Sequence, residues 1–189
     1  TMNDGTDKDD VLPELKHGAH SVTTIYEYSD GYYDRNKKDF YGFGTVKTTF
    51  AYGNCQDDVY YNREYYSKGC INTSTVKTAD GAILSESTTT LEDAPYPLPK
   101  KEESRIYEKS SGTGCYIATA TSYKYDLRYG NCIKITQDFG DGQKLSADIT
   151  YDNTNATDYI IGLPVDIRVY DSNGNLLRYR SGDYDDLGQ

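Results

Sequence analysis

The sequence lacks tryptophan altogether and has one methionine and two histidines among its 189 residues. It also lacks any run of the roughly 20 apolar residues that a membrane-spanning helix requires, so we expect no membrane span. The two histidines, His17 and His20, supply too few ligands for a zinc site. No histidine stands near a serine or cysteine at a strand end, so the sequence assembles no nucleophilic site. We therefore expect no metal, no cofactor and no enzymatic activity.

Cysteine is scarce: the chain has four, at Cys55, Cys70, Cys115 and Cys132, with no C-x-x-C spacing. They are too few for a disulfide-based scaffold and allow three pairings. Bridges between Cys55 and Cys70 and between Cys115 and Cys132 would each close a hairpin-sized loop, and this pairing is preferred if the protein is exported. Unpaired thiols in a reduced chain are the alternative.

Basic side chains are outnumbered, because 30 acidic residues against 20 basic ones give a formal charge of −10. Nucleic acids and anionic membranes both select basic surfaces, so this balance argues against either as a partner. The simplest interpretation is a soluble, self-repelling surface.

Tyrosine dominates what the chain does contain, with 21 tyrosines beside four phenylalanines. Tyrosine and threonine both favour β-strands, and threonine runs at 48–49 and 88–90 add to that preference. Much of the buried apolar surface must come from tyrosine rings, whose hydroxyls need hydrogen-bond partners. The composition predicts an all-β fold with little or no helix.

Turn residues divide the chain into short strands, which predicts antiparallel hairpins and meanders rather than βαβ units. Asp80-Gly81 is a strong hairpin signal, residues 29–31 supply another turn, and 157–161 could form one helical turn. The expected strands run over 21–28, 45–52, 58–66, 72–77, 82–91, 105–109, 115–125, 131–137, 144–151, 164–170 and 176–180.

Three of the five prolines fall within residues 92–103. Proline cannot donate to a strand ladder, so this segment is expected to connect two parts of the fold. The expected order is a polar flexible leader (1–20), a first β subdomain (21–91), the proline-rich connector (92–103) and a second β subdomain (104–189).

A recurring Y-D-x-x-G-N motif marks the second half of the chain. One copy is formed by Tyr170, Asp171, Gly174 and Asn175, and a copy with one extra residue by Tyr125, Asp126, Gly130 and Asn131. A third, of the Y-D-x-L-G type, contains Tyr184, Asp185 and Gly188. In each, a strand ends in tyrosine, the aspartate accepts turn amides and the glycine allows positive φ. Three copies indicate a repeat.

These motifs resemble the YD-repeat, or Rhs, family. More narrowly, the passages 26–46, 60–86 and 158–164 resemble, in order, the middle region of toxin-complex B components and plasmid-virulence-type insecticidal toxins. The departures from that pattern are the residue inserted before Gly130, tyrosine at Tyr159 in place of a tryptophan, and the four cysteines.

The resemblance implies curved antiparallel sheets that form part of a β shell, which encloses a toxic C-terminal polypeptide. It implies a protein secreted by, or displayed on, a bacterial cell. Its partners would be the rest of a longer chain, continuing past Gln189, or other toxin subunits.

Two other hypotheses come from the residues alone. Tyrosine doublets, at which neighbouring rings point to opposite faces of a strand, could form a surface that binds glycan or a protein partner. These doublets are Tyr32-Tyr33, Tyr60-Tyr61 and Tyr65-Tyr66. Asp138 and Asp141 could hold calcium, but a plain turn is the favoured interpretation because the EF-hand spacing is absent.

Overall fold

The computed structural model describes residues 2–3, 21–108, 115–153 and 161–184, and its regular elements there are β-strands. Two short strands, β1 (Met2–Asn3) and β2 (Ser21–Val22), pair with each other. The other eleven strands form one sheet. They are β3 (Ile25–Asp34), β4 (Asp39–Thr49), β5 (Cys55–Tyr60), β6 (Ile71–Lys77), β7 (Ile83–Leu91), β8 (Pro99–Tyr107), β9 (Tyr116–Asp126), β10 (Asn131–Asp138), β11 (Lys144–Asp152), β12 (Leu163–Tyr170) and β13 (Leu176–Ser181).

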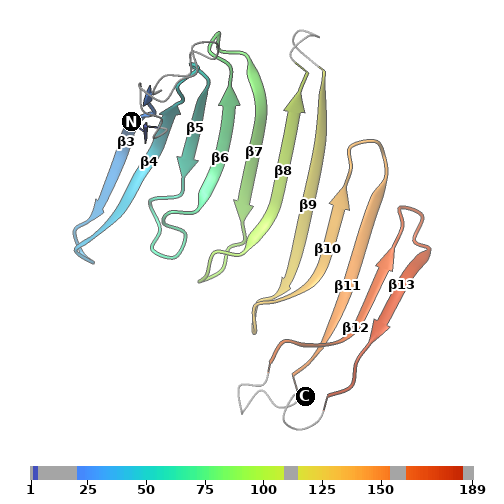
Figure 1. The fold of residues 1–189 in the computed structure, drawn as a ribbon. Coiled ribbons are helices and arrows are strands. Elements are labelled where there is room, and N and C mark those ends of the chain that lie inside the picture. Colours follow the sequence, from blue (N-terminus) through green and yellow to red (C-terminus); the bar gives the residue numbers. More distant parts are fainter. Residues whose placement is uncertain (1, 4–20, 109–114, 154–160, 185–189) are drawn as a thin grey trace.

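Each strand of the large sheet pairs antiparallel with its neighbours in the sequence. The result is an up-and-down meander with open edges at β3 and β13 (Figure 1). The all-β antiparallel fold predicted from the sequence is confirmed. In the described part of the chain, no helix is long and apolar enough to span a membrane.

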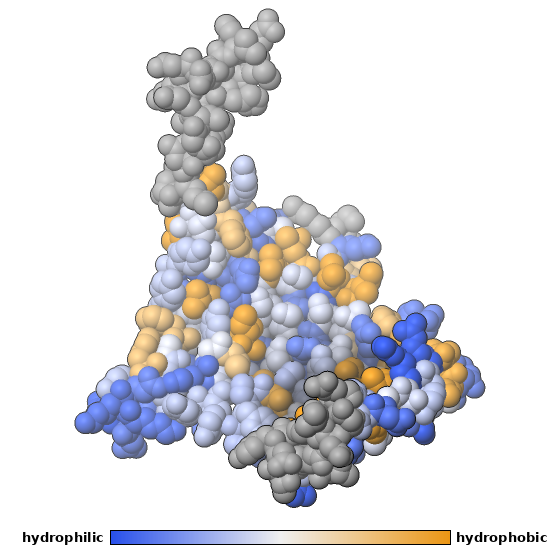
Figure 2. Space-filling model, turned by 60° about the horizontal axis from the view of Figure 1, so that its bottom comes forward, coloured by the Kyte–Doolittle hydropathy of each residue, from blue (hydrophilic) through white to orange (hydrophobic). Residues whose placement is uncertain are grey.

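The large sheet has a single layer. Its strands contact only their sheet neighbours, and no other strand lies over either face within the described residues (Figure 1). Tyr41, 4% exposed, is the one buried apolar side chain there. Figure 2 shows the consequence: separate apolar patches remain on the surface. A domain normally buries such surface between two layers, so this sheet needs a covering that these residues do not supply.

One face of the sheet carries the ion pairs made within its strands. Directly paired residues share a face and side chains alternate along each strand, so the register assigns each residue to one face. By this rule seven ion pairs of the described strands lie on the same side, which we call the charged face. They are Glu27–Lys47, Asp57–Lys77, Glu86–Arg105, Lys101–Glu103, Lys134–Asp148, Asp138–Lys144 and Asp166–Arg168.

The opposite face, which we call the aliphatic face, is different. Ile106 and Ile117 lie directly opposite each other across β8 and β9 and are 61% and 65% exposed. Further along the same side, Ile135 pairs with Ala147, and Ile149 with Ile167. The polar centre of this face is built mainly from serine and threonine, at Ser74, Ser85, Ser87, Thr89 and Ser104.

Some of the strand and turn boundaries predicted from the sequence are wrong. Residues 99–103, expected in a connector, belong to β8, and residues 101–103 are paired on both sides. Pro99 is tolerated there because it begins the strand, next to a bulge between Thr90 and Leu91. The turn expected at 29–31 is also wrong, since β3 continues through Asp30, whose φ is 55°.

Parts of the predicted organisation remain open. Of the predicted leader only Met2–Asn3 is described, as β1, and the helical turn expected at 157–161 lies outside the described residues except for Ile161. The ladder runs unbroken from β7 to β8 to β9. The division into two β subdomains stays a prediction.

The preferred disulfide pairing is wrong, because all four cysteines are free. Cys55 pairs with Lys77 at one end of β5, whereas Cys70 lies beyond the other end, its carbonyl accepting the amide of Tyr61 at 2.9 Å. At ~3.3 Å per strand residue, these cysteines are roughly 20 Å apart. Cys115 and Cys132 lie near opposite ends of β9, about 33 Å apart by the same spacing. A disulfide requires Cα atoms within about 7 Å.

We therefore expect a reducing agent to leave the thermal stability of this chain unchanged. The measurement is Tm by circular dichroism with and without dithiothreitol, alongside a thiol titration of the denatured protein. Four reactive thiols and an unchanged Tm are the expected result. A lower Tm in dithiothreitol would show that a disulfide contributes to the fold.

Candidate functional site

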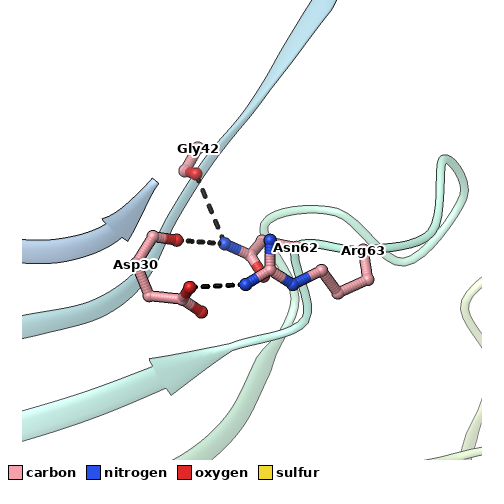
Figure 3. A network of polar contacts seen from close by, with 4 residues as sticks. All are labelled: Asp30, Gly42, Asn62 and Arg63. Carbon is pink, nitrogen blue, oxygen red and sulfur yellow. Dashed lines mark hydrogen bonds and ion pairs between the residues drawn. The ribbon is translucent and has the colours of Figure 1, made fainter. Parts of the chain in front are cut away.

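A network of polar contacts ties the loop after β5 to the first hairpin of the sheet. The Asn62 side chain is 3% exposed, and its amide donates to the carbonyl oxygens of Asp30 at 2.7 Å and Gly42 at 3.4 Å. Arg63 forms an ion pair with the Asp30 carboxylate (Figure 3). We call these four residues the loop clamp. It fixes a loop across β4 onto β3.

Gly44 makes room for the loop clamp. A Cβ atom at this position would press on the Asp30 carboxylate and lie 3.0 Å from the amide nitrogen of Asn62. The glycine lies opposite Asp30 in the β3–β4 ladder, where any side chain would displace the carboxylate that pairs with Arg63.

Beside the loop clamp lies a group of aromatic rings, Tyr32, Tyr41, Tyr65 and Tyr66, which we call the tyrosine cluster. The Tyr41 ring lies 5.6 Å from Tyr32 and 6.2 Å from Tyr65, and Tyr65 lies 5.2 Å from Tyr66. All three contacts are edge-on, the geometry that aromatic quadrupoles favour.

Cations cover the tyrosine cluster. The Lys68 ammonium lies 4.9 Å from the centre of the Tyr41 ring and 4.5 Å from that of Tyr65. The Arg63 guanidinium lies 4.7 Å from the centre of Tyr32. Each is within cation–π range. Lys68 is in addition ion-paired with Asp39, so the cations bind rings and carboxylates together.

The Tyr41 hydroxyl donates to the Asp34 carboxylate at 2.8 Å. The pKa of Tyr41 is raised to about 12, mainly because the hydroxyl is buried and in addition because it donates to an anion. The pKa of Asp34 is lowered, chiefly by the backbone amide of Lys37 and then by the Tyr41 hydroxyl. This arrangement holds fixed charges and rings in place, and it offers no group poised for proton transfer near neutral pH.

The structure brings together three of the six doublet tyrosines. Tyr32, Tyr65 and Tyr66 belong to the tyrosine cluster. The other three doublet tyrosines are not part of the cluster. Tyr33 is 53% exposed, and burial raises the pKa of Tyr60. The Tyr61 hydroxyl donates to the Thr89 carbonyl at 3.0 Å. A shared binding surface over all six stays a prediction.

The Y-D motif at residues 170–175 forms a hairpin turn. Asp171 accepts the amides of Asn173 at 2.9 Å and Asn175 at 2.8 Å, and Gly174 has φ 81°. The Asn175 side-chain amide also donates to Asp171, at 2.9 Å. This bond has the largest effect in lowering the pKa of Asp171, and the backbone amides add to it. Tyr170 ends β12 immediately before this turn. The motif is therefore a device for closing a hairpin.

The second copy closes its turn differently, in keeping with its extra residue. Asp126 accepts the amide of Arg128 at 3.0 Å with its side chain and that of Gly130 at 2.7 Å with its carbonyl. Asn131 begins β10 after Gly130, and Tyr125 donates to the Pro99 carbonyl at 2.9 Å. In the third copy Tyr184 donates to the Pro164 carbonyl at 3.1 Å, while Asp185 and Gly188 lie outside the described residues.

No group of three or more histidine, cysteine, aspartate or glutamate side chains could hold a metal ion within the described residues. Asp138 and Asp141, weighed as calcium ligands, instead accept amides of their own turn from Gly140 at 3.0 Å and Gln143 at 2.9 Å. Asp138 is also ion-paired with Lys144.

The loop clamp could not be predicted from the sequence. Asn62 lies within residues 58–66, which the sequence predicts to be a strand, and its acceptors Gly42 and Asp30 are 20 and 32 residues away. Tyr41 belongs to the passage 26–46 that resembles the family, and nothing in that passage indicates that its ring is buried. The charged run at residues 100–103 does not indicate the charged face, because Lys101 and Glu103 lie on that face and Glu102 lies on the other.

Comparison with known proteins places these features in a wider context. Residues 9–74 match the family described as the insecticide toxin TcdB middle/N-terminal region. No curated protein matches the chain.

Solved structures match over more of the chain. A TcdB2–TccC3 crystal structure shares 12% identity with it over 79% of its length, with a TM-score of 0.55. A Photorhabdus luminescens Tc holotoxin pore shares 13% identity over 79%, with a TM-score of 0.57. In both cases the match covers 12% of the solved chain. The chain thus resembles the middle region of toxin-complex B components, in sequence over its first third and in fold over most of its length.

Proposed function

We propose that this chain is a structural segment of a toxin-complex-like YD-repeat protein, forming part of a β shell that encloses or presents a toxin or effector polypeptide. The observation that carries the proposal is the single-layer sheet, with a charged face on one side and an aliphatic face on the other. The likeness in fold to TcdB2–TccC3 supports it. In this role the chain binds and shields, and it catalyses no reaction.

The two faces suit the two sides of a wall. The charged face satisfies its long side chains with one another, so it can remain in water. The aliphatic face leaves Ile106 and Ile117 exposed side by side, and such a surface is stabilised when another polypeptide covers it. We assign the aliphatic face to the enclosed polypeptide.

The partners follow from the same assignment. They are the remainder of a longer chain, which would continue the sheet beyond its open β3 and β13 edges, and other toxin subunits. The solved relatives include a Tc holotoxin, and the site of action proposed for this chain is outside the bacterial cell or on its surface.

Two neighbouring residues of β9 test the proposal. Ile117 lies on the aliphatic face and Tyr116 on the charged face, and both are large and about half exposed or more, so lysine at either should leave the fold intact. The probe is reduced, carboxymethylated α-lactalbumin, which stays unfolded, and binding is followed by fluorescence anisotropy. We expect Ile117→Lys to weaken binding roughly tenfold, because burial of an isoleucine contributes about 1.5–3 kcal/mol.

The matched variant Tyr116→Lys should change the affinity by less than about twofold, since that ring lies on the other side of the sheet. Folded α-lactalbumin should bind far more weakly than the unfolded form. Equal losses in the two variants, or equal binding of folded and unfolded probe, would contradict the assignment of the aliphatic face.

A further inference from the structure

A cavity of about 310 Å³ lies at the loop edge of the sheet, between the β5–β6 loop and the β7–β8 loop. Both loops lie at the lower edge in Figure 1. Its walls include the rings of Tyr61, Tyr66 and Tyr96 and the side chains of Glu64, Glu92 and Asp93. We call it the rim pocket. Its volume is at the small end of ligand sites, which suits a single side chain better than an extended ligand.

Two of the three rings are held in place by distant backbone. The Tyr61 hydroxyl donates to the Thr89 carbonyl at 3.0 Å, and the Tyr96 hydroxyl donates to the Leu127 carbonyl at 2.8 Å. Because these hydroxyls are engaged, the rings offer the pocket their apolar bodies. Rings fixed in this way lose little conformational entropy when a ligand binds.

The charge of the rim pocket is not balanced. Within the described part of the chain, Glu92 has an ion pair, with Lys100 at 3.4 Å, whereas none joins Glu64 or Asp93. The pocket thus combines aromatic walls with two carboxylates that lack a cation. The tyrosine cluster shows the complementary arrangement in the same molecule, since Lys68 there covers two rings and pairs with Asp39.

We propose that the rim pocket binds a basic side chain, arginine or lysine, of a polypeptide partner. The apolar stem of such a side chain packs on the rings, and its cation pairs with Glu64 and Asp93 and lies over an aromatic face. A neutral glycan would leave both carboxylates without a counter-charge. The assignment goes beyond the proposed shell role, because the aromatic and charged residues that line the pocket all lie on its two loops.

The test must separate this pocket from the general attraction of a chain with charge −10 for any cation. The probe is fluorescein-labelled hexa-arginine, with hexa-glutamate as the charge-reversed peptide, and binding to the whole chain is measured by anisotropy near physiological salt. The site variant is Glu64→Gln with Asp93→Asn. The matched control, Glu27→Gln with Asp183→Asn, removes the same charge from the charged face and the region after β13.

We expect the site variant to weaken hexa-arginine binding about tenfold or more and the control to weaken it less than about twofold. Tyr66→Leu, at a ring that is 60% exposed, keeps the fold and should weaken binding about threefold through loss of the cation–π contact.

Equal losses in site variant and control, no loss in Tyr66→Leu, or no binding of hexa-arginine would overturn the proposal. So would binding of cellohexaose that Tyr66→Leu abolishes and the charge variants leave intact, because that result would assign the pocket to glycan. Failure of the α-lactalbumin experiment would leave this outcome unaffected, since neither Ile117 nor Tyr116 lines the rim pocket.

Discussion

Replacement of Gly140 by alanine is expected to destabilise the fold by about 3–4 kcal/mol, well beyond the same change at Gly142. Both glycines lie in the β10–β11 turn and have positive φ, 80° and 88°. Alanine in that region costs roughly 1–2 kcal/mol through backbone strain alone. At Gly142 a new Cβ atom meets nothing within 4 Å, so strain is the whole effect.

Gly140 carries a second penalty. Its Cβ atom would run into the backbone carbonyl of Ala118 on β9, with the carbonyl carbon only 3.1 Å away. A backbone atom in a paired strand cannot swing aside as a side chain can, so the turn itself must move. That movement would disturb the bond from the Gly140 amide to Asp138 at 3.0 Å and the ion pair of Asp138 with Lys144 at 2.9 Å.

Urea denaturation followed by circular dichroism measures both variants against the parent chain. Parallel transitions with equal slopes would show that the change lies in stability and not in the extent of unfolding. The difference between the two alanine variants isolates the contact with Ala118. If the two lose the same free energy of unfolding, the approach of this turn to β9 does not contribute to the fold.

The turns show which features can be predicted from local sequence. Asp80-Gly81 and the Tyr170–Asn175 motif predicted hairpins because aspartate, asparagine and glycine act on amides within four residues of themselves. Their bonds are local, so their positions could be predicted. The same rule failed at Asp30, where Ser29 and Gly31 still pair with Thr45 and Phe43. A partner strand overrode the local turn preference there.

The candidate site was beyond prediction for the opposite reason. Nothing near Asn62 indicates that it will be buried, because its partners Asp30 and Gly42 reach it only after three strands have paired. The charged face depends likewise on register, since a shift of one residue would move Lys47 and Asp57 to the other side of the sheet. The composition was enough to predict the strands. Which residues share a face of the sheet could be assigned only from the register in which the strands pair.

Asn62→Asp is expected to be the most destabilising single exchange in the loop clamp, with a loss of about 3–5 kcal/mol near neutral pH. The exchange keeps the size of the side chain but replaces an amide donor by a carboxylate. Its oxygen would then face the carbonyls of Asp30 and Gly42, which need a donor, in a position that is 3% exposed. Arg63 is already paired with Asp30, so it cannot fully neutralise the second carboxylate.

The pH dependence of this loss identifies its cause. A carboxyl group at position 62 is stable in the folded chain only when protonated, so folding raises its pKa above the unfolded value of about 3.9. The difference in stability from the parent should therefore be smallest below that pH, where the protonated group can donate one hydrogen bond. It should widen as pH rises towards the folded pKa and then level off.

Asn54→Asp is the matched control, because it introduces the same charge at an exposed loop position and should cost no more than about 0.5 kcal/mol at any pH. Urea denaturation of all three chains between acid and neutral pH gives the comparison. A deficit for Asn62→Asp that does not change with pH would mean that lost packing, and not the missing donor, explains it. A deficit equal to that of the control would show that the Asn62 amide does not hold the β5–β6 loop to the first hairpin.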